Sequence, residues 1–167
     1  MAPNGTSTGN SEATRAPRPS AQRAAAIVLA AGSSRRMGPE NKLLLPIDGE
    51  PMVRRAVRQV LGAGCVEVVV VLGHAADDVA HALAGLGARS VLNRDHASGQ
   101  VSSVRAGLGA LCEPVDAVMI CLGDQPLLTS ADLRAVLDAY GEREQRSAGD
   151  DAKCPHNTTS RRRRQDG

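Results

Sequence analysis

Short apolar runs alternate with segments of helical periodicity from residue 24 to residue 140, and this alternation is the strongest constraint on the fold. The run at 66–72 (VEVVVVL) is nearly all β-branched, which is typical of a strand covered on both faces. Strands that alternate with helices are joined by right-handed crossovers and therefore form a parallel sheet. The sequence predicts strands at 24–29, 66–72, 88–92 and 117–122, the last of them buried, and a brief extended segment at 43–46. It predicts helices at 51–61, 76–86, 101–111 and from Thr129 or Ser130 through Tyr140.

The segments outside this alternation set the expected domain boundaries. Residues 1–22 are rich in Pro, Ser, Thr and Gly and are expected to form a disordered lead-in. Residues 23–141 form the predicted domain. Residues 142–167 are charged and polar and end in the run Arg161–Arg164, so we expect a disordered tail. Nuclear targeting or nucleic-acid tethering by this run stays an open alternative.

Charge and aromatic content argue against a nucleic-acid partner. Residues 1–23 hold three Arg and one Glu, and residues 150–167 hold one Lys, four Arg and three Asp. Of the 20 basic and 18 acidic residues in the chain, 12 and 14 are therefore left between these ends. This middle part has no basic excess. The chain has no Trp or Phe and one Tyr, so it lacks the rings on which proteins usually stack single-stranded bases.

Localisation and thiol state are predicted from what the sequence contains. No stretch has the length and apolarity of a membrane span, and residues 1–23 lack the apolar core of a secretion signal, so we expect a cytoplasmic protein with no membrane partner. Cys112 and Cys121 flank or lie inside apolar runs and are expected to be buried free thiols. Cys154 and His156 lack the further ligands that a zinc site needs.

The loop after the first predicted strand is the main candidate for chemistry. Small residues (Ala-Ala-Gly at 30–32) allow backbone N–H groups to approach a ligand, and the cations that follow suit a polyphosphate. The Walker pattern fails because Pro39 follows the second glycine, and the dinucleotide fingerprint fails because only Gly32 fits it. We therefore expect a nucleoside triphosphate at this loop, near Arg35, Arg36, Gly38 and Lys42.

Four motifs in a fixed order identify a resemblance. The loop reads L-A-A-G-x-S-x-R-M-G-x(3)-K over 29–42, and K-L-L-x-P-x-x-G-x-P follows from Lys42 to Pro51. N-x(5)-G-x(3)-S-x(3)-G begins at Asn93, and G-D-Q-P follows the fourth predicted strand at 123–126. These motifs resemble those of the MobA-like nucleotidyltransferases, and among them the molybdenum cofactor cytidylyltransferases most.

The resemblance implies where the nucleotide would lie. The base would be bordered by the backbone of Ala30, Ala31 and Gly32, next to Leu29, and the triphosphate would be cradled by Ser34, Arg36 and Gly38. In the family an Ala-Ala-Gly loop accompanies cytidylyl transfer and an Ala-Gly-Gly loop accompanies guanylyl transfer, so Ala31 favours CTP.

The resemblance also implies the catalytic and metal-binding residues. Arg36 and Lys42 would act on the phosphates, Lys42 at the α-phosphate, and Asn93 and Ser103 would line the nucleoside side. Asp124 would hold Mg²⁺. The chemistry is consistent with these roles, because an ionised phosphate acceptor needs no strong base and a carboxylate suits Mg²⁺ among phosphates.

The implied fold is a Rossmann-like three-layer α/β/α arrangement with a mostly parallel sheet, similar to nucleotide-diphospho-sugar transferases. The implied reaction moves CMP from CTP to the phosphate of molybdopterin with release of pyrophosphate, and a molybdoenzyme or cofactor chaperone is a further implied partner. The acceptor half of the family domain is not visible after Tyr140, so we expect an incomplete C-terminal side and an inactive chain. Another phosphate acceptor, with GTP or a sugar phosphate, and a non-catalytic nucleotide-binding module remain alternatives.

Overall fold

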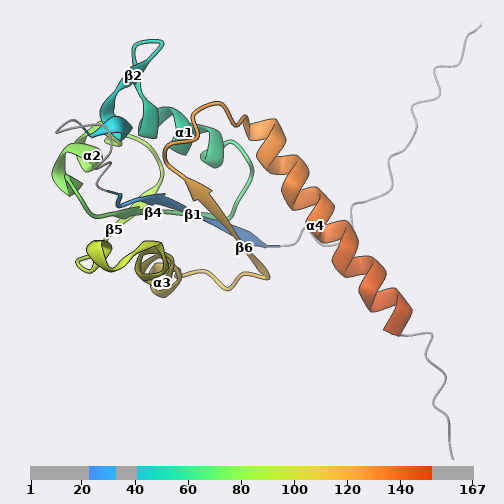
Figure 1. Cartoon of the computed structure of the whole chain (residues 1–167). Coiled ribbons are helices and arrows are strands. Elements are labelled where there is room, and N and C mark those ends of the chain that lie inside the picture. Colours follow the sequence, from blue (N-terminus) through green and yellow to red (C-terminus); the bar gives the residue numbers. More distant parts are fainter. Residues whose placement is uncertain (1–22, 33–40, 152–167) are drawn as a thin grey trace, which may run out of the picture.

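The computed structural model describes residues 23–32 and 41–151. Its centre is a sheet of four parallel strands in the order β5-β4-β1-β6 (Figure 1). The prediction of an α/β fold with a parallel sheet is confirmed, and each predicted strand is present: β1 (Ala24–Ala30), β4 (Glu67–Leu72), β5 (Arg89–Leu92) and β6 (Ala117–Leu122).

Helices cover both faces of this sheet and complete three layers. Helices α1 and α2 lie on one face and α3 on the other, while α4 starts beside α1 and extends away from the sheet (Figure 1). A two-stranded antiparallel hairpin precedes α1. The bounds are η2 (Lys42–Leu44), β2 (Pro46–Ile47), β3 (Glu50–Pro51), α1 (Met52–Leu61), α2 (Ala76–Ala82), η3 (His96–Ser98), α3 (Gln100–Ala110) and α4 (Ser130–Asp151).

Strand β1 forms the centre of the core because alternate side chains enter opposite layers. Val28 packs with the α1 and α2 side, whereas Ile27 packs with the α3 side. Helix α3 approaches the sheet closely at Gly107, where a β carbon would lie 2.4 Å from Cγ2 of Ile27. A glycine is needed there because Ile27 is fully buried and has no room to move.

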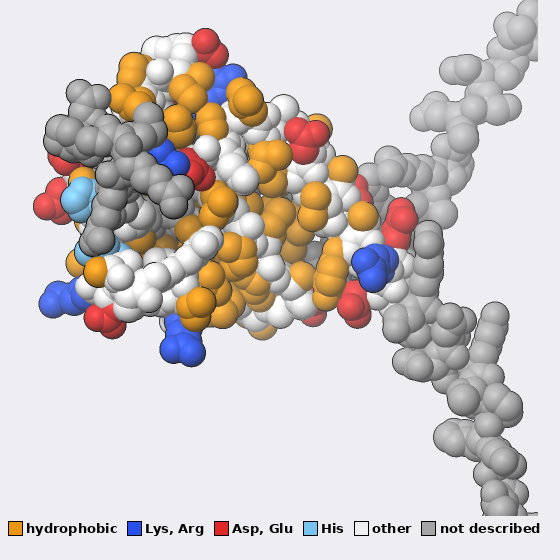
Figure 2. Space-filling view, in the orientation of Figure 1, with side chains coloured by type: hydrophobic (Ala, Val, Ile, Leu, Met, Phe, Trp, Pro, Cys, Tyr) orange, Lys and Arg blue, Asp and Glu red, His pale blue; other side chains and the backbone are white. Residues whose placement is uncertain are grey.

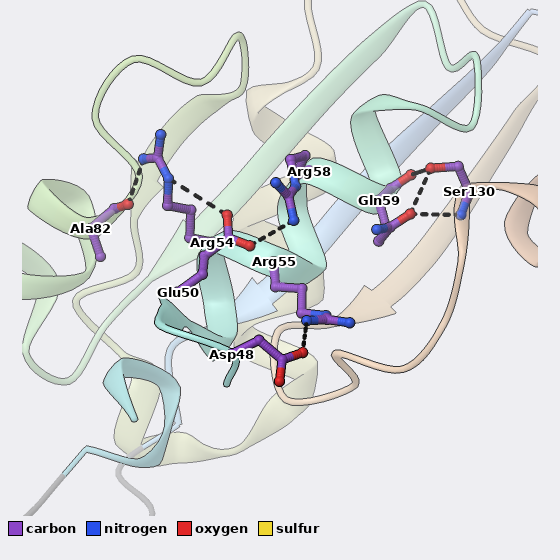
Figure 3. Close-up of polar contacts among 8 residues, drawn as sticks. All are labelled: Asp48, Glu50, Arg54, Arg55, Arg58, Gln59, Ala82 and Ser130. Carbon is purple, nitrogen blue, oxygen red and sulfur yellow. Dashed lines mark hydrogen bonds and ion pairs between the residues drawn. The ribbon is translucent and has the colours of Figure 1, made fainter. Parts of the chain in front are cut away.

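Helix α1 is amphipathic, as its sequence period predicts. Its inward face buries Val53, Ala56, Val57 and Val60. Its outer face carries arginines that bind the preceding hairpin: Arg58 contacts Glu50 with N–O at 2.6 Å, and Arg55 contacts Asp48 at 2.7 Å (Figure 3). Helix and hairpin are thus held together by ion pairs on the solvent side.

Helix α4 is attached to α1 at its first turn. The Ser130 hydroxyl donates to the Gln59 backbone carbonyl oxygen at 2.8 Å, and the Ser130 N–H donates to the Gln59 side-chain oxygen at 3.0 Å (Figure 3). Thr129 caps the helix, as predicted, by exchanging hydrogen bonds with Asp132. These bonds from Thr129 outweigh slight desolvation and lower the pKa of the Asp132 carboxyl.

Four local predictions are wrong. Residues 42–44, where an extended segment was expected from Leu43, form a 3-10 helix. Helix α4 continues past Tyr140 to Asp151, and residues 142–146 (EREQR) are good helix formers. Strand β6 was expected to be buried, but it lies at the end of the described sheet. Cys112 is exposed because it follows the end of α3 rather than lying in a strand.

Cys121 agrees with its prediction. It is buried, and desolvation raises the pKa of its thiol to about 11, so the thiol stays protonated and packs as a small apolar group. Over residues 23–32 and 41–151, no helix combines the length and apolarity required to traverse a bilayer.

Candidate functional site

The candidate site lies where the carboxyl ends of the parallel strands meet. Ala31 and Gly32 follow β1, Gly73 follows β4, Asn93 follows β5, and Asp124 follows β6. Because all four strands run in one direction, these residues share one edge of the sheet, where α/β proteins usually bind their ligands.

An ion pair joins two of the predicted catalytic residues. Lys42 Nζ lies 2.5 Å from Asp124 Oδ2, although 82 positions separate the two residues in sequence. Both side chains are about one-third exposed, at 34% and 32%. The contact leaves each charge accessible from solvent, so a phosphate could approach the ammonium group and a cation could approach the carboxylate.

Local structure fixes the backbone on both sides of this pair. Leu43 is buried in the core, and the Asn41 side-chain oxygen accepts a hydrogen bond from the Leu43 N–H at 3.1 Å, which caps the short η2 helix. On the other side, the Gly123 N–H donates to the Leu29 carbonyl oxygen at 3.0 Å and ties the Asp124 loop to β1.

Asn41 is a residue that the sequence analysis did not single out. Because its side-chain oxygen faces the Leu43 N–H, the orientation of its amide is fixed, and the amide nitrogen points elsewhere. This nitrogen is buried, and within the described part of the chain it has no hydrogen-bond partner. Because a buried donor without a partner is rare and this one adjoins Lys42, Asn41 is a further candidate residue of the site. Only its place directly before the motif lysine could have drawn attention to it in the sequence.

Asn93 is buried and forms the centre of a hydrogen-bond network. Its amide nitrogen donates to the hydroxyl oxygens of Ser102 at 2.9 Å and Ser103 at 3.0 Å. Its side-chain oxygen accepts from the Asp95 N–H at 3.0 Å. Ser103 is also buried, with 4% of its surface exposed. The network therefore fixes the path of the chain from β5 into α3.

Two loops of the candidate site meet at Gly73: the loop that begins after β1 at Ala31, called the nucleotide loop below, and the loop after β5. A β carbon at this position would lie 2.7 Å from Cβ of both Ala31 and His96. The absence of a side chain at Gly73 therefore allows two loops from different strands to approach each other. The His74 N–H also donates to the Ala31 carbonyl oxygen at 3.2 Å, so β4 supports the end of β1.

Several predicted residues can be compared with this geometry. The side chains of Ala30 and Ala31 are buried, which leaves only their backbone for a ligand, while Gly32 is exposed and Leu29 is half-buried. Ser34, Arg35, Arg36 and Gly38 lie outside the described residues. No group of three or more His, Cys, Asp or Glu able to hold a metal occurs in the parts of the chain that the structure describes.

A three-layer α/β domain with an open parallel sheet belongs to the class of α/β folds that bind ligands at the carboxyl ends of their strands, which is where Lys42 and Asp124 form their ion pair. Comparison with known protein families identifies the family within this class. The chain belongs to the MobA-like NTP transferase domain family, which matches residues 26–163.

The match with each curated relative covers only part of that relative's length. The chain is 38% identical over 113 residues to the bifunctional protein GlmU of Rhizobium etli (strain CIAT 652), which covers 66% of this chain and 25% of that protein. It is 41% identical over 115 residues to the nicotine blue oxidoreductase of Paenarthrobacter nicotinovorans, which covers 68% of this chain and 55% of that protein.

Solved structures agree with the fold. A nucleotidyl transferase from Methanothermobacter thermautotroptrophicus superposes with a TM-score of 0.62 at 33% identity, covering 70% of this chain and 57% of that one. The manganese complex of Rv0371c from Mycobacterium tuberculosis H37Rv superposes with a TM-score of 0.61 at 28% identity, covering 72% of this chain and 61% of that one.

Proposed function

We propose that this chain is the nucleotide-binding part of a nucleotidyltransferase, an enzyme that transfers a nucleoside monophosphate from a triphosphate to a phosphate-bearing acceptor. The observation that carries the proposal is the contact between Lys42 and Asp124 at the carboxyl edge of the sheet. Family membership and the similarity to a solved nucleotidyl transferase support the same class of reaction.

The chemistry needs charge placement more than proton transfer. An oxygen of the acceptor phosphate attacks the α-phosphorus, a new P–O bond forms, and the bond from the α-phosphorus to the bridging oxygen breaks as pyrophosphate leaves. The acceptor oxygen is already ionised, so no general base is required. Lys42 neutralises charge that builds on the phosphates, and Asp124 orients the Lys42 ammonium group until the nucleotide arrives.

Asp124 also fits a role as a divalent-metal ligand. Mg²⁺ is usually held by one or two carboxylates together with substrate phosphates, and a single accessible carboxylate at the strand end meets that need. When bound, the metal supplies positive charge to the phosphates. The manganese complex of Rv0371c supports a divalent cation in a protein of this fold, and we propose Mg²⁺ for this chain.

The finer assignment is CTP as donor and molybdopterin as acceptor. It is supported by the Ala-Ala-Gly sequence at 30–32 and the G-D-Q-P turn at 123–126, which resemble those of the cytidylyltransferases. We propose that Arg36, Ser34 and Gly38 complete the triphosphate site. A cytoplasmic setting is part of the proposal, supported by the free thiols of Cys65, Cys112 and Cys121, which fit a reducing compartment.

Binding and turnover should be measured separately, because the chain spans about a quarter of GlmU and just over half of the solved nucleotidyl transferase. Calorimetric titration of the full chain with Mg–CTP tests the nucleotide half. Asp124→Asn should weaken binding about tenfold or more, since hydrogen bonds to charged groups are worth about 1.5–3 kcal/mol. Asp138→Asn, on the exposed part of α4, is the matched control.

Pyrophosphate release from Mg–CTP with molybdopterin tests the acceptor half. Release that Asp124→Asn abolishes would establish transfer to this acceptor. Binding without release would support a nucleotide-binding module or another acceptor, and a panel of sugar phosphates separates these two alternatives. Failure of the full chain to bind any Mg–nucleoside triphosphate would contradict the proposed function.

The nicotine blue oxidoreductase similarity favours a redox function as a second candidate. The dinucleotide fingerprint is missing from this sequence, which argues against it. Protection of the chain against thermal unfolding by NAD(P)H, without protection by Mg–CTP, would favour the redox function instead.

A further inference from the structure

His96 lies at the junction between the nucleotide loop and the loop after β5. Its Cβ and the Cβ of Ala31 both lie 2.7 Å from the position that a β carbon of Gly73 would occupy. We propose that His96 is a specificity-determining residue that contacts the nucleobase, and that Asn93 is the positioning residue that holds it. The inference rests on the nucleotide-binding function proposed above.

Asn93 has little capacity left to bind a nucleotide directly. Both hydrogens of its amide are used by Ser102 and Ser103, its side-chain oxygen is used by the Asp95 N–H, and its own N–H donates to the Leu72 carbonyl oxygen at 2.8 Å. Only 5% of its surface is exposed. A side chain this fully engaged fixes the loop and does not read a ligand.

The network around Asn93 also orients the His96 ring. Nδ1 of His96 lies 3.2 Å from the Asn93 carbonyl oxygen. A carbonyl oxygen can only accept, so Nδ1 must carry the proton in this contact. In the neutral ring Nε2 is then an acceptor, and no partner for Nε2 is found in the ranges 23–32 and 41–151.

A hydrogen-bond acceptor on His96, whose Cβ lies at this junction, would distinguish the two pyrimidine bases. Cytosine carries an exocyclic amino group, which donates a hydrogen bond, where uracil carries a carbonyl oxygen, which does not. His96 Nε2 would accept from cytosine and would face uracil oxygen without a hydrogen bond. The residue therefore favours a cytidine nucleotide through a contact that an Ala-Ala-Gly backbone alone does not provide.

Two substitutions distinguish the roles of the two nitrogens of the His96 ring. His96→Asn keeps a side-chain donor near the Asn93 carbonyl oxygen and removes the acceptor at the Nε2 position, whereas His96→Gln places an amide near the Nε2 position. Titration of the full chain with Mg–CTP and Mg–UTP should show that His96→Asn lowers the preference for CTP about five- to tenfold, the value of one hydrogen bond, and that His96→Gln restores part of it. His81→Ala, an exposed histidine on α2, should leave the preference unchanged.

A structural role for His96 alone would change thermal stability without changing the ratio of the two affinities, so melting temperatures are recorded for each variant. An unchanged CTP-to-UTP ratio in His96→Asn would overturn the inference and leave the proposed function intact. If the unmodified chain bound neither nucleotide, the proposed function would fail first and the inference with it.

The tautomer gives a second, independent test. Long-range ¹H–¹⁵N correlation spectra of the full chain distinguish a neutral ring protonated on Nδ1 from one protonated on Nε2. We expect the Nδ1–H form for His96 without nucleotide and a change in the Nε2 resonance on addition of Mg–CTP. An Nε2–H tautomer, or an Nε2 resonance that Mg–CTP leaves unchanged, would contradict the proposed contact.

Discussion

Ile27 and Ile120 are paired neighbours in adjacent parallel strands, yet their surroundings differ completely. Ile27 in β1 is fully buried, whereas 42% of Ile120 in β6 is exposed. Strand β1 has a partner on both sides, while β6 ends the described sheet. The same residue type in the same register therefore has a structural role in one strand and leaves an apolar surface in the next.

The exposed surface extends beyond one residue. Figure 2 shows hydrophobic side chains gathered on the face where β6 and the start of α4 lie in Figure 1. A strand edge bordered by apolar side chains favours association with other polypeptides. The large apolar residues that are exposed near this strand and on α3 and α4 include Leu108, Ile120, Leu127, Leu128, Val136 and Tyr140.

The largest expected difference comes from truncating the two isoleucines. Ile27→Ala should lower the free energy of unfolding by about 2–5 kcal/mol, because it opens a cavity in a closed core. Ile120→Ala should lower it by about 1 kcal/mol or less, because solvent already reaches the side chain. Urea unfolding of both variants tests the comparison, and equal losses would show that β6 is covered in solution.

A pair of glycines in α3 repeats the contrast on one helix. Gly107→Ala should destabilise the protein by about 1–3 kcal/mol, since the new methyl group would overlap Ile27. Gly109→Ala should stabilise it by about 0.5–1 kcal/mol, because nothing lies within 4 Å of the new atom and alanine favours a helix. Thermal unfolding of the two variants gives the sign directly. Stabilisation by Gly107→Ala would mean that α3 lies farther from the sheet.

Association through β6 is expected to depend on Ile120. Ile120→Lys should reduce self-association at high protein concentration, because a charge on an edge strand opposes pairing. Its effect on the free energy of unfolding should stay within about 0.5 kcal/mol. Light scattering over a concentration series measures the effect, with Leu92→Lys on the opposite edge strand β5 as the matched control. Equal effects of both substitutions would remove the distinction between the two edges.

The smallest effect concerns Glu67, which ties the start of β4 to the segment before β6. Desolvation is the largest single influence on the pKa of this carboxyl and raises it, but hydrogen bonds from the Cys112 and Glu113 N–H groups and the nearby Arg89 guanidinium together outweigh it and hold the pKa below its ordinary value of 4.5. A carboxyl with a lowered pKa in the folded state stabilises that state above the pKa of the unfolded chain. This contribution is lost as pH falls through the folded-state pKa.

Glu67→Gln should therefore be less stable than the unmodified chain at pH 7, and the difference should shrink as the pH falls below the ordinary carboxyl pKa of 4.5. Urea unfolding of both proteins across this pH range measures the difference. A difference that grows toward acid pH would contradict the assignment.

The sequence predicts the kind of element better than its surroundings. The runs VEVVVVL and AVMICL both indicate buried strands, and both form strands, but only β4 has neighbours on both sides. Local composition does not encode strand order, so exposure of β6 could not be foreseen. The place of Asp124 at this edge was predictable because parallel strands bring their carboxyl ends together, whereas Lys42 was expected near it only from the motif resemblance. The network of Asn93 and the approach of His96 to Gly73 depend on side-chain packing that no sequence period reports.

Lys42 has a rigid base and a flexible stem. Its backbone is held by the Asn41 cap and by Leu43, which is anchored in the core, while the Leu45 N–H donates back to the Lys42 carbonyl oxygen at 3.1 Å. The ammonium group can therefore leave Asp124 by rotation about its side-chain bonds alone. Such rotations of accessible side chains take picoseconds to nanoseconds. The Lys42 ammonium group can then exchange the Asp124 carboxylate for an incoming phosphate without movement of the sheet. The rate of this exchange is limited by the arrival of the anion.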